Sequence, residues 1–211
     1  MKKQNLISVG AIHIIVVLFF LFVYLTPTHF TFLIWNVFLA LLPLDFALVV
    51  AYTKRVTLGT VFSILWLLFY PNTMYMITDY IHLQYIGIGL TVRMQYFNYA
   101  VLSAGIFIGV VLGILSLELI FKHYFDKRHD VLELLLMAVL SIISGVGIYI
   151  GRFLRLNSWD VFTRLQHVLS LIVESFSMHM IVFVTLFAGV QFAILVISHY
   201  GIRLIQNTVD K

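Results

Sequence analysis

Asp79 and His82 are the residues whose types and spacing are best suited to chemistry, and they lie in the segment LWLLFYPNTMYMITDYIHLQY. In a helix through this segment, at 100° per residue, Asn72 and Tyr75 fall on the same face. A carboxylate and an imidazole three residues apart can ligate one metal ion or move protons as a pair. We therefore interpret Asp79 and His82 as a candidate catalytic pair, and Asn72 and Tyr75 as candidate substrate-binding residues. The alternative is a membrane boundary with a belt of tyrosines and no chemistry.

A second polar segment, GIYIGRFLRLNSWDVFTRLQHVL, contains Arg152 and Arg155 one helical turn apart. Guanidinium groups can bind a phosphate or a carboxylate through paired hydrogen bonds. They can equally pair with Asp79 or Asp160, or extend toward lipid headgroups. Asn157 followed by Asp160 is typical of a helix start, with Asn157 as the cap. Arg152, Arg155 and Asp160 are thus candidate substrate-binding residues, although capping is favoured over catalysis for Asp160.

A third polar pair, Asn36 and Asp45, lies within the apolar run WNVFLALLPLDF. Asn36 is a further candidate substrate-binding residue near the end of the run, whereas Asp45 lies deeper. An aspartate inside a membrane helix is costly unless it is partnered or protonated. Asp45 is therefore either a functional intramembrane residue or a structural hydrogen-bond partner of a neighbouring helix.

The elements that position these residues are predicted to be transmembrane helices. The chain has 211 residues, of which 62% are hydrophobic and 10% are charged, and its mean hydropathy is +1.06. No water-soluble domain could bury that much apolar surface, and long apolar runs without alternation favour helices over a barrel. The runs predict six transmembrane helices at about residues 6–25, 31–52, 58–76, 99–121, 131–153 and 178–200.

The distribution of Lys and Arg along these helices predicts the orientation. Nine of the 13 gather on one side, and the other four, Arg93, Arg152, Arg155 and Arg164, lie on the opposite side. The positive-inside rule places the nine, and both termini, in the cytoplasm. The connections 77–98 and 154–177 are then extracytoplasmic. Because topology accounts for the net charge of +4, we expect no nucleic-acid partner.

Metal binding stays open. The absence of cysteine excludes disulfides, thiolate metal sites and a cysteine nucleophile. Some of the histidines on the extracytoplasmic side could join Asp79 in a zinc site; these are His29, His82, His167 and His179. The chain has no HExxH or similarly dense motif, so the sequence identifies no cofactor.

Small residues predict how the fourth and fifth helices pack. Gly105, Gly109 and Gly113 recur every fourth residue, and the fifth helix has similar small faces. Such spacing lets backbones approach closely in lipid, so we expect these two helices to touch there, and a helix–helix oligomer could use the same glycines. Glu118 and Glu133, near the cytoplasmic helix ends, are expected to be solvated.

The complete prediction is an all-α membrane protein with a single polytopic domain, 1–211. It comprises a bundle of six transmembrane helices and, after Asp160, an extracytoplasmic amphipathic helix. That helix has a polar stripe opposite Leu165, Val168, Leu169 and Ile172, and it either lies in the membrane interface or caps the bundle. The first apolar run is expected to be a retained helix, because TPTHF after it offers no small-residue cleavage site.

Three segments of the chain, WNVFLALLPLDF, LWLLFYPNTMYMITDYIHL and GRFLRLNSWD, resemble an uncharacterised family of bacterial integral membrane proteins, domain of unknown function family 1361. The resemblance extends over nearly the whole chain. It implies a bacterial cell-membrane protein, and it carries over no activity, cofactor or catalytic residue.

The leading functional hypothesis is an outward-facing polar site that binds an anionic envelope substrate, such as a phospholipid or a lipid-linked precursor. If the protein is an enzyme, Asp79 and His82 act as the acid/base or metal pair, and the two arginines hold phosphate. One alternative is a small transporter or channel that uses Asp45 and proline-kinked helices. Another is a scaffold without chemistry that binds partner helices through its glycine faces.

Overall fold

The computed structural model describes residues 3–86, 91–125, 129–156 and 158–209, which are helical and contain no strand. In chain order the elements are α1 (Lys3–Leu25), α2 (Phe32–Tyr52), α3 (Val56–Phe69), α4 (Pro71–Tyr75), the 3₁₀-helix η1 (Met76–Tyr85), α5 (Val92–Tyr124), α6 (Asp130–Tyr149), the π-helix η2 (Ile150–Leu154), α7 (Asp160–Thr163), α8 (Leu165–Glu174) and α9 (Met178–Val209). The predicted all-α fold is confirmed.

Within the part of the chain that the structure describes, six helical runs are long and apolar enough to cross a membrane, the number that the sequence predicts. They are Lys3–Leu25, Phe32–Tyr52, Val56–Gln84, Arg93–Tyr124, Asp130–Leu154 and Met178–Thr208. The third span continues through α4 and η1 beyond its predicted end at Met76, and α5 begins before its predicted start at Tyr99. The polar residues between Asn72 and His82 therefore belong to the end of a span, and not to a long loop.

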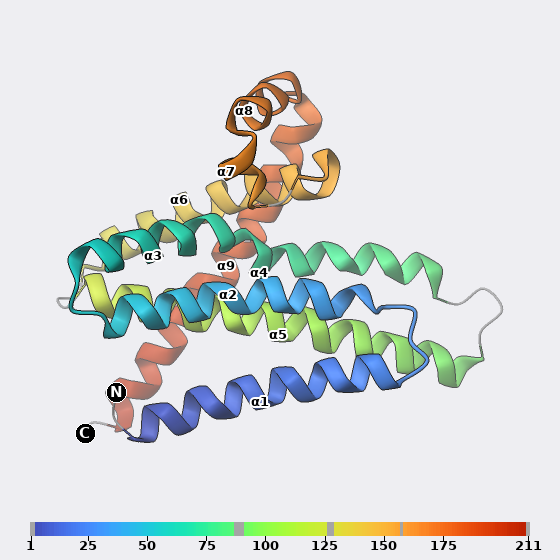
Figure 1. The fold of residues 1–211 in the computed structure, drawn as a ribbon, viewed down its shortest axis with the longest axis horizontal. Coiled ribbons are helices and arrows are strands. Elements are labelled where there is room, and N and C mark those ends of the chain that lie inside the picture. Colours follow the sequence, from blue (N-terminus) through green and yellow to red (C-terminus); the bar gives the residue numbers. More distant parts are fainter. Residues whose placement is uncertain (1–2, 87–90, 126–128, 157, 210–211) are drawn as a thin grey trace.

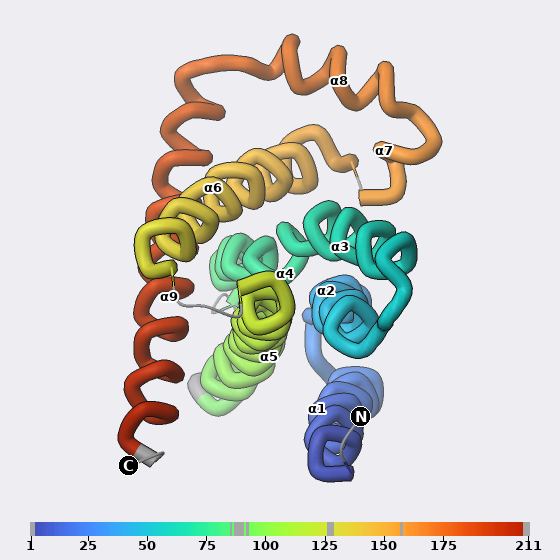
Figure 2. Tube along the Cα trace, turned by 90° about the vertical axis from the view of Figure 1, so that its left-hand side faces the viewer, coloured from blue at the N-terminus to red at the C-terminus, as the bar shows by residue number. Residues whose placement is uncertain are grey.

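The spans form two groups that meet where α4 contacts α6 and α5 contacts α9 (Figures 1 and 2). In one group α2 packs along α5 and α3, with α1 against α2 and α5; in the other, α6 packs against α9. The segment with α7 and α8 forms an arch between the end of α6 and the start of α9 (Figure 2). The start of α1 and the end of α9 lie at the same end of the bundle, which we call the termini end (Figure 1).

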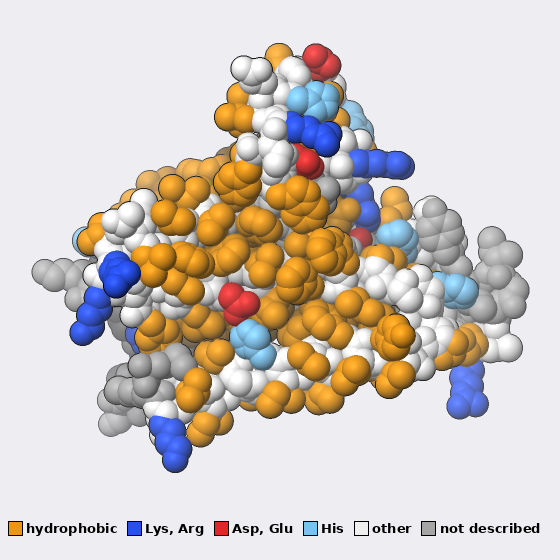
Figure 3. Space-filling model, in the orientation of Figure 1, with side chains coloured by type: hydrophobic (Ala, Val, Ile, Leu, Met, Phe, Trp, Pro, Cys, Tyr) orange, Lys and Arg blue, Asp and Glu red, His pale blue; other side chains and the backbone are white. Residues whose placement is uncertain are grey.

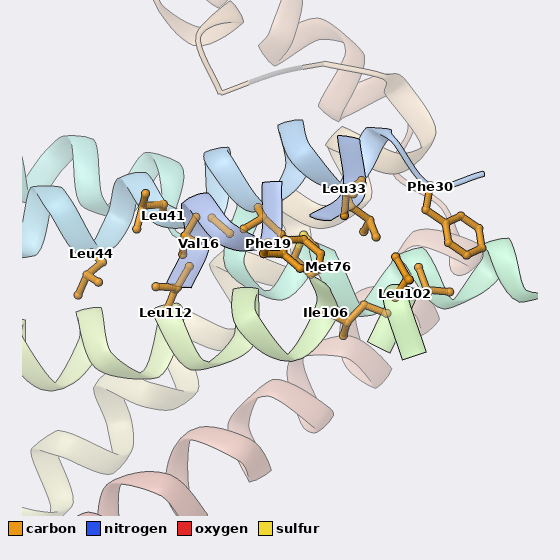
Figure 4. Close-up of a cluster of buried hydrophobic side chains, with 14 of the residues drawn as sticks. Val16, Phe19, Phe30, Leu33, Leu41, Leu44, Met76, Leu102, Ile106 and Leu112 are labelled. Atoms are coloured by element: carbon orange, nitrogen blue, oxygen red, sulfur yellow. The ribbon is translucent and has the colours of Figure 1, made fainter. Parts of the chain in front are cut away.

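Apolar side chains from α1, α2 and α5 form one of two buried clusters. Phe19, Leu33, Leu102 and Ile106 lie together in it, and Met76 of η1 packs among them (Figure 4). The second cluster joins the third span to α5, α6 and α9. In a membrane such contacts stabilise the fold by close packing, because lipid is as apolar as the side chains that the contacts bury.

The outer surface is as apolar as the interior. Ile14, Val139 and Ile197 have exposed fractions of 61%, 51% and 72%. Hydrophobic side chains cover most of the visible face along the spans, whereas Lys and Arg side chains lie mainly toward its margins (Figure 3). A surface of this kind is stable in contact with lipid and not with water.

The glycines of α5 and α6 pack against other helices and not against each other. A Cβ on Gly113 of α5 would lie 2.6 Å from Thr73 Oγ1, and one on Gly147 of α6 would lie 2.8 Å from Pro71 Cγ, so both positions face the third span. Gly105 faces Leu33 of α2, and Gly145 faces Val184 of α9. The predicted contact between the two glycine faces is therefore wrong, because the third span, α2 and α9 occupy them. An oligomer through the α5 glycines stays a prediction, and it would have to form on faces that the chain itself already fills.

The expectation that Glu133 is solvated is also wrong. Glu133 is 5% exposed, and the ring of His199 bonds to both Glu133 and Glu118. The helix ends at this side of the bundle thus contain a partly buried polar network, which the position of the two glutamates in the sequence did not indicate.

Candidate functional site

Asp79 is the centre of a polar cluster that joins three spans. Its side chain is 1% exposed. Asn36 of α2 donates a hydrogen bond from Nδ2 to Asp79 Oδ2 at 2.8 Å, and Arg152 of η2 donates from Nη2 to Asp79 Oδ1 at 3.3 Å. The two polar segments and the polar end of α2 therefore converge, although they are far apart in the sequence.

Arg152 is held from several directions by the third span. Its Nη1 donates to Tyr75 Oη at 3.1 Å, its Nη2 donates to the carbonyl oxygen of Thr78 at 2.5 Å, and its guanidinium lies 5.2 Å from the centroid of the Tyr75 ring. Of the alternatives open for Arg152, pairing with Asp79 is the one observed. Because a buried carboxylate needs a partner, this pair ties α6 to the third span.

The 3₁₀ geometry of η1 determines how Asp79 and His82 are arranged. With three residues per turn, side chains at i and i+3 eclipse each other, and His82 Nε2 lies 4.0 Å from Asp79 Oδ1. The His82 ring is also 4.4 Å from the ring of Phe32 and 6.5 Å from that of Phe30, measured between centroids. The predicted proximity of acid and imidazole is present, but in a tighter helix than the α-helix assumed.

Two glycines bring Arg152 within reach of its partners. A Cβ on Gly147 would contact the ring of Pro71, and one on Gly151 would lie 3.4 Å from Tyr75 Cε2. At Gly147 the approach of α6 to α4 leaves no room for a Cβ, whereas Gly151 lies at ordinary contact distance from Tyr75. Directly after α6 the backbone changes from α-helical to π-helical geometry in η2. Short π-helical segments are frequent at functional sites.

A cavity of about 540 Å³ opens beside this cluster, between α2, α3, α4 and α6. Its wall is mainly aliphatic and aromatic. Polar groups enter it from Asn36, Asn72, Tyr75 and Ser158, and Asn72 donates a hydrogen bond to Ser158 Oγ at 3.1 Å. That bond connects α4 to the segment that leads into the arch.

The apolar stripe of α8 faces the same cavity. All four residues predicted to form it line the cavity, namely Leu165, Val168, Leu169 and Ile172. Val168 is 5% exposed, whereas Leu165 and Leu169 are about half exposed at 51% and 53%. The apolar face of α8 thus packs over the cavity, and it covers the cavity only in part.

Arg155 and Asp160 are not among the described residues that line the cavity. Arg155 ends η2 with a left-handed backbone, φ 56°, which is uncommon for a residue with a side chain. Its side chain is exposed, and the next residue, Leu156, does line the cavity. Asp160 is the first residue of α7, and the helix cap proposed for Asn157 lies outside the described residues.

A zinc site has no support among the residues that the structure describes, because no group of three or more metal-binding side chains comes together there. His82 packs on phenylalanine rings, and His179 lies against the rings of Tyr149 and Phe153. Both rings are therefore in largely aromatic surroundings.

Asp45 has a partner that the sequence analysis missed. His13 of α1 bonds through Nε2 to Asp45 Oδ1 at 2.9 Å, and through Nδ1 to the carbonyl oxygen of Val9. The two side chains are 36% and 38% exposed. A single imidazole in the otherwise apolar first run was the available signal, since a buried acid and base inside a membrane usually pair.

Comparison with known proteins gives a family but no activity. A family model described as Protein of unknown function (DUF1361) matches residues 35–194, a range that contains the whole polar cluster and the cavity. Neither the curated proteins nor the solved structures include a match to this chain.

Proposed function

The chain belongs to the family described as Protein of unknown function (DUF1361), and we propose that it binds an anionic lipid of the cell envelope in the cavity beside Asp79 and Arg152. The observation that carries the proposal is an apolar cavity of about 540 Å³ with a few polar groups at one part of its wall. Sites for amphipathic ligands combine a large apolar wall with a few convergent polar groups.

The apolar part of the cavity suits an acyl or isoprenoid chain. Leu67 and Val146 line it from α3 and α6, and the half-exposed Leu165 and Leu169 of α8 line its open side. Because the surrounding helices face lipid, a chain could enter laterally from the bilayer without crossing water. We propose that α8 lies in the membrane interface and covers this entrance.

The polar part of the cavity suits a headgroup. Asn36, Asn72, Tyr75 and Ser158 present amide and hydroxyl groups there, which can hydrogen-bond phosphate or sugar oxygens. Arg152 is already bonded to Asp79, so we assign the attraction for negative charge to the exposed Arg155. A positive charge next to Leu156 at the cavity wall would favour an anionic headgroup.

The geometry favours binding over catalysis. Both carboxylate oxygens of Asp79 accept hydrogen bonds from the chain, and the residue is fully buried. A general acid or base must reach the proton that it transfers. We therefore infer that Asp79 and Arg152 position α4 against α6, and that they keep the cavity open.

We propose that the termini face the cytoplasm and the cavity faces the outer side, as the excess of Lys and Arg predicts. Single cysteines in this cysteine-free chain test the orientation directly. His29→Cys and Lys54→Cys replace exposed residues at opposite ends of the spans. We expect a membrane-impermeant maleimide to label the first in intact cells and the second only after permeabilisation; the reverse pattern would overturn the orientation.

A cavity-filling substitution tests lipid binding. Val146→Trp places an indole in the cavity, and Val139→Trp, two turns earlier on α6 at a position 51% exposed, is the matched control. The indole takes the volume that an acyl chain would fill and removes its packing contacts with the wall, and losing about 1.4 kcal/mol of such contacts lowers affinity about tenfold. Native mass spectrometry with phosphatidylglycerol should show this loss only for Val146→Trp; equal binding by both variants would refute the site.

Headgroup preference is a separate measurement. We expect Arg155→Gln to reduce the preference for phosphatidylglycerol over phosphatidylcholine, and Arg93→Gln, an exposed arginine at the start of α5, to leave it unchanged. Equal preferences in the two variants would contradict the role assigned to Arg155 while leaving the cavity itself in place.

A further inference from the structure

A second cavity, of about 530 Å³, lies at the termini end between α1, α2, α5 and α9. It shares no lining residue with the first cavity. Aliphatic and aromatic side chains form most of its wall, among them Ile12, Leu44, Leu48, Leu115 and Leu119. The wall is therefore suited to hydrocarbon.

Charged groups of both signs enter this second cavity from α5, α6 and α9. His199 bonds through Nδ1 to Glu118 Oε1 at 2.8 Å and through Nε2 to Glu133 Oε2 at 3.3 Å. Arg203 bonds to Asp130 at 2.6 Å and to Glu133 at 3.4 Å. Glu133 and Arg203 are thus occupied by partners within the chain, and their side chains are 7% and 17% exposed.

Among the described residues that line this cavity, Glu118 and Lys122 carry the charges that are most accessible to a ligand. Glu118 bonds to His199 through Oε1, and its side chain is 25% exposed, so the carboxylate can accept a further hydrogen bond. Lys122 follows four residues later on α5, is exposed, and lines the same cavity. Residues at i and i+4 are neighbours on one helix face. A carboxylate and an ammonium group therefore line the same apolar cavity one helical turn apart.

We propose that this cavity binds a phospholipid whose headgroup has a primary amine beside its phosphate. The lipid ammonium would donate to Glu118, the lipid phosphate would accept from Lys122, and an acyl chain would lie along the wall formed by α1, α2 and α5. The charge pattern favours a zwitterion: a purely anionic headgroup would meet Glu118, and one without N–H donors would leave that carboxylate without its hydrogen bond.

The test compares phosphatidylethanolamine with phosphatidylcholine, which has the same net charge but no ammonium N–H. We measure binding to the purified, delipidated full chain by native mass spectrometry. A charge-assisted hydrogen bond is strong enough to give phosphatidylethanolamine roughly a tenfold preference. We expect Glu118→Gln to remove most of that preference, and Glu174→Gln, at the end of α8, to retain it. Equal binding of the two lipids by the unmodified protein, or an unchanged preference in Glu118→Gln, would overturn the proposal.

A second pair of variants covers the case in which Glu118→Gln does not fold. Leu48→Trp fills the cavity, and Leu18→Trp, on α1 with 54% exposure and outside both cavities, is its control. We expect only Leu48→Trp to lose the bound phosphatidylethanolamine, and retention in both variants would reject the site. Val146→Trp should keep the phosphatidylethanolamine preference, so that a failure of the first cavity is distinguishable from a failure of this one.

Discussion

Replacing Arg152 by methionine tests whether the contact with Asp79 holds the third span to α6. The substitution keeps a long side chain but removes the charge and every hydrogen bond that the guanidinium donates. Asp79 is 1% exposed, and it would retain the hydrogen bond from Asn36 and the neighbouring His82, whose Nε2 lies 4.0 Å from Asp79 Oδ1. Removing one partner of a buried pair typically costs about 3–5 kcal/mol, because the remaining charge is uncompensated.

The opposite substitution should cost less. In Asp79→Asn the arginine keeps its bonds to Tyr75 and to the carbonyl of Thr78, and its side chain is 20% exposed. We expect a loss of about 1–3 kcal/mol, the usual range for a hydrogen bond to a charged group. The double variant Arg152→Met/Asp79→Asn contains no buried charge, so we expect it to be more stable than Arg152→Met alone.

The assay is unfolding in mixed micelles by increasing sodium dodecyl sulfate, followed by circular dichroism and tryptophan fluorescence. Trp35 and Trp159 lie 6.1 Å apart, measured between ring centroids, and Trp35 lines the first cavity, so they report on this part of the fold. A loss below about 1 kcal/mol for Arg152→Met, typical of an exposed pair, would refute the reasoning. So would a double variant in which the two single losses simply add.

Two further predictions use the same measurement. Gly113→Val forces branched carbons against Thr73, and overpacking of this kind should cost about 1–3 kcal/mol, whereas Gly201→Ala has open space around its Cβ and should be neutral or slightly stabilising; equal effects would contradict the packing. His13→Leu leaves Asp45 without its partner and should cost about 1–3 kcal/mol, while the double variant with Asp45→Leu should recover that loss in an environment of lipid. No recovery would show that the pair is not what stabilises this contact.

The six spans were predictable from the sequence because each is a long apolar run. The length and hydrophobicity of such a run indicate that a helix can cross a membrane. The end of the third span did not follow. Its polar residues lower the local hydropathy, yet Asn36 and Arg152 satisfy the Asp79 carboxylate from other helices. Those partners exist only in the folded bundle, so no local pattern could have shown that the helix continues to Gln84.

The sequence indicated which residues form the site, but it did not indicate how their side chains are arranged. Asn36, Tyr75, Asp79 and Arg152 were singled out and do converge, because polar side chains near the membrane core need partners. The pairing of Glu133 with His199 was missed, since it depends on which helices are adjacent. The cavity was missed for the same reason: α2, α3, α4, α6 and α8 line it together, and α6 and α8 are distant from the other three in the sequence.

The length of η1 depends on its helix type. Ten residues rising about 2.0 Å each span roughly 5 Å more than the same residues in an α-helix, which rises about 1.5 Å per residue. A change of η1 to α-helical geometry would therefore draw Tyr85 toward the bilayer centre and rotate His82 by about 60° relative to Asp79. The same ten residues thus set both the depth of the chain at Ile86 and the alignment of the acid with the imidazole.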